Sequence, residues 1–521
     1  MSDAVDNLAV PVPERGASGG GDPAIGQYAL RALRAISSLK LTVTLFALSI
    51  VLILAGTVAQ VDMGIWLVMS KYFRCFFCWI EFDLFFPHGW DIPGSIPFPG
   101  GWTIGGLLLI NLLSAHSIKF KAKAQGMDLL WGFLAAAGGT IIIIYSVSQL
   151  MADVADATGD MWTGFLPFAV GGGILGGSGI TCWGFIILFA KRAGVVLLHA
   201  GIIIMILSEI ITGVAAIETN MNITEGTFAN YAADIREVEL AIVESGKDED
   251  KVVVIPQRAM LNHMNHTMAS GGEGSSKIIK DASLPFDVEI LRYYPNANIF
   301  DPRDATNPNL PPMEQKSAAE AMKVAEKNLA TDGIGTFGRV VRLTRGTGTG
   351  GSSEVDTPAV YAKLTTDKET IGTYLLWSKF TRPQDNIKVG DKTYKVALRF
   401  RRHYKPYEMH LIDVRHDVFP GTNIPRNYSS KIRLIDKELG EDREVLVYMN
   451  HPLRYRGDVY FQSQVQKFRP DSMSELQEAT VFQVVRNPAW IWPYISCAMV
   501  AAGMLVHFGQ TLTRFMGRML A

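Results

Sequence analysis

Three histidines lie within or at the ends of long apolar segments. His199 is the only polar residue in the run VVLLHAGIIIMIL, whereas His116 and His507 lie near the ends of two other apolar segments. Polar side chains inside membrane-spanning segments are costly and often functional, so we favour a functional role for His199 over a packing role. Taken singly, His116 and His507 are more typical of histidines at the membrane interface.

Together these histidines predict a particular chemistry. Haem iron takes one or two axial nitrogen ligands, and imidazoles on facing apolar helices supply them. His199, His116 and His507 are all predicted at similar depth in one leaflet, although depth alone leaves open which helices face each other. The pattern therefore predicts a haem b site built from these three residues, with His199 as an axial ligand of the iron.

The other histidines and the cysteines give weaker signals. His263 and His266 would suit a metal or haem, but exposed loop histidines are the favoured interpretation. Of the group His403, His410 and His416, the last two are an even number of residues apart and are expected to share one strand face, too far apart to be adjacent ligands. Cys75 and Cys78 form CFFC, which is not a c-haem attachment motif because Trp79 stands where CxxCH has histidine, and a structural pair is favoured over a redox pair.

The remaining polar and glycine signals favour structural interpretations. Glu209 lies towards the outer end of its apolar segment and is expected to reach the interface rather than relay protons. The glycines between Gly171 and Gly179 predict close helix packing. The sequence contains no nucleophile elbow, HExxH or P-loop motif, and the net charge of −1 offers no basic field for nucleic acid.

Six apolar segments are long enough to cross a membrane, although the fourth is Gly-rich and the second is short. They are Leu41–Val61, Trp102–Lys119, Leu129–Leu150, Phe165–Ala190, Gly194–Ile217 and Trp490–Leu512. Basic residues cluster before the first, after the second, between the fourth and fifth, and after the sixth segment. The positive-inside rule then predicts that both termini are cytoplasmic and that the region before the last segment is periplasmic.

These segments predict an integral membrane α-helical protein with a large β-rich extracytoplasmic domain inserted between spans five and six. Short alternating runs broken by Gly, Pro and Asn predict an antiparallel sandwich or an open barrel-like sheet, with one helix at Lys316–Leu329. Within the outer loop, Ile65–Phe86 is predicted to lie as a helix in the interface. The expected domains are a largely disordered cytoplasmic N-terminus (1–39), a five-span membrane domain (40–217) with an outer loop (62–101), a periplasmic domain (218–486), and a last span with a short tail (487–521).

Three stretches resemble one family of membrane proteins. Ser37–Gln60 is similar to that family's first span, and Leu198–Ser208 (LHAGIIIMILS) is similar to its histidine-carrying span. The most specific stretch joins Asp413–Ser430 to Tyr448–Ser463 and contains a Pro-x-x-Tyr-Ser turn followed by Asn-x-Pro-Leu, Gly and Tyr-x-Gln. These features resemble the ResB family of System II cytochrome c biogenesis, over about 37–61 and 193–510 and weakly within 220–400.

The resemblance implies a role in haem handling at the inner membrane. ResB proteins act with a ResC/CcsA-type membrane partner to move haem outward and attach it to the CxxCH motifs of apocytochrome c. The family residue that carries over is His199, which is thought to hold haem jointly with a histidine of the partner. The family's Trp-rich haem-handling motif belongs to the partner and is absent from this sequence, so the resemblance implies a non-catalytic subunit of a haem lyase (cytochrome c synthase) complex that binds haem b transiently.

Two departures from the family leave alternatives open. ResB proteins have three spans before the soluble domain where five are predicted here, and the role of the additional pair at 129–190 is unassigned. The second iron ligand is His116, His507 or a histidine of the partner. Two other classes of function compete: a membrane-anchored periplasmic scaffold or binding protein without haem, and a b-haem electron-transfer subunit.

Overall fold

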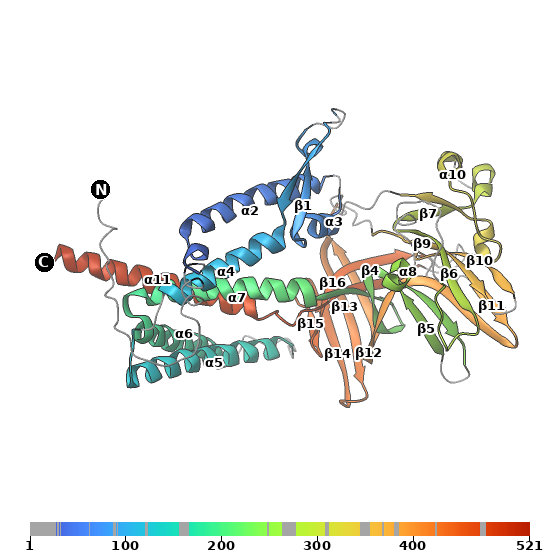
Figure 1. Cartoon of the computed structure of the whole chain (residues 1–521). Helices are drawn as coiled ribbons and strands as arrows, with labels where there is room; N and C mark the ends of the chain where they lie inside the picture. Colours follow the sequence, from blue (N-terminus) through green and yellow to red (C-terminus); the bar gives the residue numbers. More distant parts are fainter. Residues whose placement is uncertain are drawn as a thin grey trace.

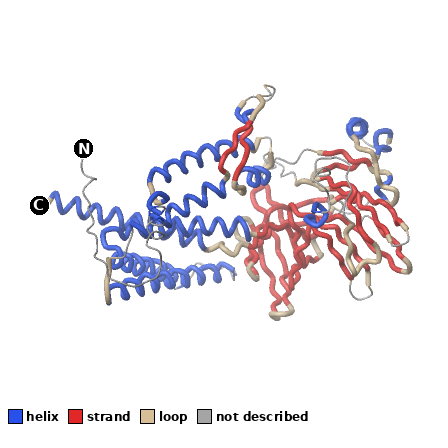
Figure 2. Tube along the Cα trace, in the orientation of Figure 1, coloured by secondary structure: helices blue, strands red, loops and turns tan. Residues whose placement is uncertain are grey.

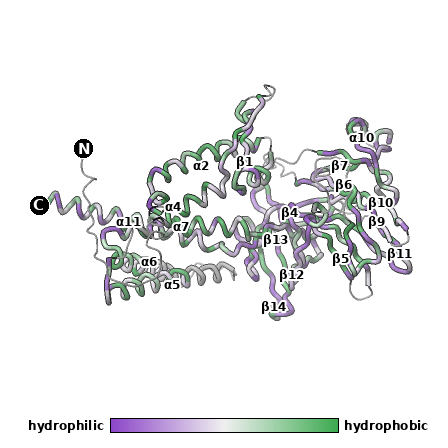
Figure 3. Tube along the Cα trace, in the orientation of Figure 1, coloured by the Kyte–Doolittle hydropathy of each residue, from purple (hydrophilic) through white to green (hydrophobic). Residues whose placement is uncertain are grey.

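The long helices gather at one end of the molecule and most of the strands at the other (Figures 1 and 2). The computed structural model describes residues 28–520 apart from 29–30, 32, 62, 87–89, 91, 120–122, 156–165, 247–249, 263–277, 308–311, 344–354, 367–368, 380–384, 423–424 and 469–475. The β-rich region lies between α7 and α11 in the chain, and hydrophobic residues run along the helices (Figure 3).

Each predicted span corresponds to a long helix. The helices are α2 (Leu39–Ala59), α4 (Gly101–Lys119), α5 (Met127–Ala155), α6 (Leu166–Phe189), α7 (Ala193–Ala215) and α11 (Trp492–Met519). Within the described residues, four helical stretches are long and apolar enough to cross a membrane, namely Leu39–Ala59, Met127–Ser146, Gly176–Ala215 and Trp492–Met519, while Gly101–His116 is a shorter apolar helix. The third stretch contains α6 from Gly176 onward and α7, which a 3-10 turn separates. The chain therefore has the helices of a membrane protein, and the count of six spans stays a prediction.

Small residues bring α7 and α11 into close contact. A Cβ added to Gly194 would lie 2.5 Å from the backbone nitrogen of His507, and one added to Gly503 would lie 2.6 Å from that of Leu198. The Ser496 hydroxyl on α11 also donates a hydrogen bond of 2.8 Å to the carbonyl of Gly201. This small-residue contact, which glycine makes possible, fixes α7 against α11.

The predicted packing role of the α6 glycines holds for part of the group. Gly177 approaches the Gly139 carbonyl of α5, which a Cβ would meet at 2.8 Å, and Gly173 approaches Ser146. At Gly176 an added Cβ would meet no atom within 4 Å, so this glycine is not required for packing.

On the other side of the bundle, Asn111 of α4 accepts a hydrogen bond of 2.8 Å from the Thr42 hydroxyl and thereby links α4 to α2.

The expected interfacial helix at Ile65–Phe86 is wrong. Helix α3 (Ile65–Val68) and a π-helical turn (Met69–Phe73) lead into an antiparallel hairpin of β1 (Phe77–Glu81) and β2 (Ser95–Pro99). Cys78 and Ile80 are buried while Phe77 and Trp79 are exposed. This burial has the two-residue period of a strand, whereas the aromatic composition of the segment had suggested a helical face.

A ten-stranded antiparallel sheet dominates the β-rich region. Its main path follows the order β14-β13-β12-β4-β3-β17-β16-β15, with β11 and β5 pairing alongside β12 and β4. Its strands are β3 (Ile217–Thr224), β4 (Phe228–Glu244), β5 (Lys251–Pro256), β11 (Asp385–Val389), β12 (Lys392–Val418), β13 (Pro425–Asp436), β14 (Glu441–Tyr448), β15 (Leu453–Tyr455), β16 (Asp458–Phe468) and β17 (Gln477–Arg486). Sheets of β6 (Asp287–Tyr294), β9 (Ala359–Thr365) and β10 (Thr370–Trp377), and of β7 (Ala297–Phe300) and β8 (Arg339–Arg342), complete the region.

Three hydrophobic cores lie in this region, and the two larger ones define its two lobes. In the lobe distant from the helices, β4, β5, β11 and β12 pack as a sandwich against β6, β9 and β10. In the lobe beside the helices, the long sheet curls, because Ser430 of β13 bonds to Gln462 of β16 and Thr480 of β17 although β12, β4 and β3 separate β13 from β17. The predicted sandwich and the predicted barrel-like sheet thus each describe one lobe.

Two local predictions within the β-rich region are corrected. The helix expected at Lys316–Leu329 is α10 (Pro312–Val324), and it ends early because the backbone of Glu326 pairs with Val340 of β8. The expectation that His410 and His416 share a strand face is also wrong. A bulge in β12 between Leu411 and Asp413 adds one residue to the strand and so reverses the faces of all residues beyond it.

Candidate functional site

The structure places His116 of α4 beside His199 of α7. Their ring centroids are 5.1 Å apart and the ring planes lie at 77°, an edge-to-face arrangement. Both residues are half-buried among the helices. The sequence places each histidine on a separate helix, and the contact between α4 and α7 brings the two together.

The two histidines also match in depth. Sixteen residues separate His199 from Ala215, the last residue of α7, which corresponds to about 24 Å at the helical rise. Fifteen residues separate His116 from Gly101, the first residue of α4, or about 22 Å. Because α7 runs towards the β-rich region and α4 runs away from the hairpin that lies on the same side, both histidines lie near the far end of the helices (Figure 1).

A local hydrogen bond determines which nitrogen of His116 carries the proton. Its Nδ1 lies 3.0 Å from the Leu112 carbonyl oxygen, four residues earlier in α4. A carbonyl oxygen only accepts, so Nδ1 is the donor and Nε2 of the neutral ring carries the lone pair. The helix backbone thereby orients the nitrogen of His116 that can accept a proton or bind a metal.

His507 does not join this pair. Its backbone packs against Gly194, five residues before His199, which places it at the same end of the helices. Its ring contacts Phe508 at 5.6 Å, and among the described residues it makes no ring contact with His116 or His199. The structure therefore brings together two of the three histidines expected from the sequence.

The geometry of the pair bears on how it would bind haem. Neutral imidazoles in apolar surroundings are suitable axial donors. With metal–nitrogen bonds of about 2 Å, two imidazoles on opposite sides of one iron have centroids about 6 Å apart, with the macrocycle between them. The 5.1 Å edge-to-face contact of His116 and His199 is shorter than this. The pair thus fits a site in which one histidine would ligate the iron and the other would contact the ring of that histidine. The opposite ligand would then come from outside the pair.

The other candidate ligands that the structure describes do not form a metal centre. Among the described residues there is no group of three or more His, Cys, Asp or Glu side chains that could hold a metal ion. His403 lies near Asp234, whereas His410 and His416 stack on Phe228 and Tyr428 respectively. The segment that contains His263 and His266 lies outside the described residues.

The cysteine pair has the environment of a structural element. The Cys75 thiol donates to the Lys71 carbonyl at 3.0 Å, and the Cys78 thiol to the Phe98 carbonyl at 3.6 Å across the hairpin. Burial, followed by the nearby Cys75, raises the pKa of the Cys78 thiol to about 11. A reactive cysteine requires a lowered pKa, so this environment favours the structural interpretation.

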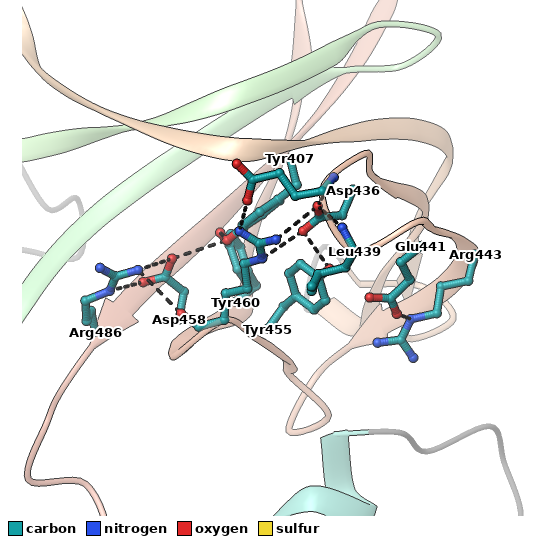
Figure 4. A network of polar contacts seen from close by, with 11 residues as sticks. Tyr407, Asp436, Leu439, Glu441, Arg443, Tyr455, Asp458, Tyr460 and Arg486 are labelled. Carbon is teal, nitrogen blue, oxygen red and sulfur yellow. Dashed lines mark hydrogen bonds and ion pairs between the residues drawn. The ribbon is translucent and has the colours of Figure 1, made fainter.

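A buried ionic cluster in the lobe beside the helices had no counterpart in the sequence predictions (Figure 4). Asp458, 1% exposed, accepts hydrogen bonds from Lys405 (2.6 Å), Tyr407 (3.2 Å) and Arg486 (2.8 Å). Tyr407 in turn shares a 2.5 Å hydrogen bond with Tyr460. The available signal was an acidic residue that opens a strand of alternating apolar residues after the turn Arg456-Gly457, where a buried position is expected.

Two comparisons of the chain with known proteins find no match. A scan of the chain against protein-family models finds no match, and neither does a search of curated proteins. The function must therefore be argued from the residues and their arrangement.

Proposed function

We propose that this chain is a cytochrome c biogenesis subunit that handles haem inside the membrane. In this proposal it acts with a ResC/CcsA-type partner to carry haem across the membrane and to present apocytochrome c for covalent attachment. The observation that carries the proposal is the contact between His116 and His199 at 5.1 Å within apolar helices. The helix that holds His199 is also the one whose sequence resembles the histidine-carrying span of the ResB family.

The proposed topology has six spans in the inner membrane, with both termini in the cytoplasm. It rests on the basic residues, since Lys40, Lys191, Arg192 and Arg514 all fall at the end of the helices far from the β-rich region. That region is then periplasmic, where apocytochrome c would be met. The histidine pair is placed in the cytoplasmic half, on the side from which haem enters.

Within this proposal the two histidines have different roles. His199 holds the iron of the haem cargo, and His116 contacts the His199 ring and fixes its orientation through its own bond to Leu112. A histidine of the partner would supply the other iron ligand. No residue of this chain is assigned a role in forming the thioether bonds.

The residues that carry the family resemblance in the β-rich region have structural roles. Asn450 (φ +64°) turns the chain after β14, and Arg456 and Gly457 form the two-residue turn between β15 and β16. Gln462 meets Ser430 in the buried core of the lobe beside the helices. Their pattern supports a shared lobe architecture, and we assign apocytochrome binding to none of them.

Covalent c-haem in cells tests the assembly role. Deleting the gene should abolish haem-stained cytochromes c, wild-type chain should restore them, and His199→Ala should not. His451→Ala, an exposed histidine of the β-rich region, is the matched control and should restore them fully. Unchanged covalent haem in the deletion strain would contradict the assembly role. It would favour a b-haem electron-transfer subunit if the purified protein contains haem, and a scaffold protein if it does not.

A further inference from the structure

A polar cavity lies where the helices join the β-rich region. It has a volume of about 350 Å³, and its lining includes Ile217, His403, Lys405, Asp458, Val484 and Arg486. These residues come from β3, β12, β16 and β17. We call this cavity the junction pocket.

The junction pocket sits at the level where a membrane surface would meet the domain. Ile217 opens β3 two residues after α7 ends at Ala215, and Arg486 closes β17 six residues before α11 begins at Trp492. The pocket is therefore framed by the two segments that connect the domain to its helices. Trp492 and Tyr494, both exposed on the first turn of α11, are of the residue types that gather at membrane interfaces.

Positive charge exceeds negative charge among the groups that meet in this pocket. Lys405 and Arg486 share one carboxylate, that of Asp458, at 2.6 Å and 2.8 Å. Burial is the largest cause that lowers the pKa of the His403 imidazole; Arg401 lowers it further, Asp234 raises it, and Lys405 makes a smaller lowering contribution. Asp458 is the buried counter-ion of Lys405, which is only 9% exposed, so the surplus charge falls on Arg486, which is 53% exposed. An anion in the junction pocket would therefore pair with Arg486, with Lys405 beside it.

Asp458 holds the guanidinium of Arg486 in a fixed orientation for an anionic ligand. The carboxylate engages the Nε and Nη2 atoms of the guanidinium, which fixes its plane, and a guanidinium offers five N–H donors in total. Arg and Lys side chains are the usual partners of phosphate groups in proteins. The rim is apolar and accessible, since Ile217 is 41% and Tyr404 57% exposed.

We propose that the junction pocket binds the phosphate of a membrane phospholipid headgroup through Lys405 and Arg486. The source is a lipid rather than free phosphate because the pocket is framed by the segments that enter the membrane helices and has an apolar rim. The net positive charge favours an anionic lipid such as phosphatidylglycerol over a zwitterionic one. The lipid would secure the β-rich domain against the membrane surface, and this inference does not depend on the haem role.

Native mass spectrometry of the full-length protein in mild detergent tests the proposal. Phosphatidylglycerol is titrated in, and retention of one lipid is compared with phosphatidylcholine and with inorganic phosphate. Arg486→Gln should weaken the tightest phosphatidylglycerol site about tenfold. Arg433→Gln is the matched control, because Arg433 is also half-exposed and paired with an aspartate at 2.6 Å but lies outside the pocket lining. It should leave lipid binding unchanged.

A second variant keeps the test independent of folding effects. Ile217→Trp fills the exposed rim but leaves both cations in place, and it should also weaken the tightest lipid site. Equal lipid retention by wild type, Arg486→Gln and Ile217→Trp would overturn the proposal. Binding of inorganic phosphate without tight lipid binding would overturn it as well, because the pocket would then take a soluble anion.

Discussion

Replacing Asp458 by Asn should destabilise the lobe beside the helices. The carboxylate is buried and holds Lys405, Tyr407 and Arg486, but these partners would be affected unequally. Arg486 is 53% exposed and reaches water, and Tyr407 keeps its bond to Tyr460. Lys405, at 9% exposure, loses its counter-ion. Breaking a buried pair in this way costs about 3–5 kcal/mol, and we expect the lower end because Asn keeps one acceptor oxygen.

Hydrogen exchange of the full-length protein measures this loss locally. A loss of about 3 kcal/mol should speed exchange of β12 and β16 amides more than 100-fold wherever their protection reflects opening of the lobe. Asp442→Asn, which removes a half-exposed partner of Arg433, should leave exchange near wild type. The double variant Lys405→Met/Asp458→Asn should recover much of the protection because no charge is left stranded. Wild-type exchange in Asp458→Asn, or no recovery in the double variant, would refute the reasoning.

Three further predictions follow from particular contacts. Gly503→Val should separate α7 from α11 and lower the thermal midpoint by several degrees, whereas Gly509→Val, where an added Cβ meets no atom within 4 Å, should not. Burial lowers the pKa of His403 in the folded state, so the unfolded state binds more protons below its ordinary value of about 6.5 and stability should fall as pH drops through that window. His403→Gln should flatten this pH dependence of unfolding, while exposed His451→Gln should not; an equal effect of both would contradict the assignment. With the pKa of Cys78 at about 11, its alkylation at pH 8 should be about 100-fold slower than in the unfolded chain, and equal rates by mass spectrometry would count against a buried thiol.

The helices and the depth of their histidines could be predicted from the sequence because each depends on local composition. An apolar run of sufficient length predicts a helix regardless of its neighbours. Which histidines meet is a different matter. The contact of His116 with His199 depends on α4 packing beside α7, and the separation of His507 depends on the close approach at Gly194. The pairing of α4 with α7 has no signal in the residues flanking the histidines, whereas Gly194 and Gly503 indicate close helix packing but do not specify the partner helix.

The β-rich region was harder to predict for two physical reasons. A single added residue in β12 reverses strand faces, so the expected alignment of His410 and His416 failed although the strand itself was recognised. The cluster around Asp458 joins β12 to the consecutive strands β16 and β17 through contacts between residues 53 and 28 positions apart, and no local pattern indicates such a meeting. In the outer loop, the aromatic residues of the β1–β2 hairpin suit both a strand and a helix, so composition does not distinguish the two there.

The most direct test of the central claim is the haem content of the purified protein. The chain is co-expressed with its ResC/CcsA-type partner, and the b-type haem absorbance is measured for wild type, His199→Ala, His116→Ala and His507→Ala. The account predicts haem in the wild type, its loss in His199→Ala, an altered spectrum in His116→Ala through the ring contact, and little change in His507→Ala. Haem retained in full by His199→Ala, or no haem in the wild-type complex, would contradict it.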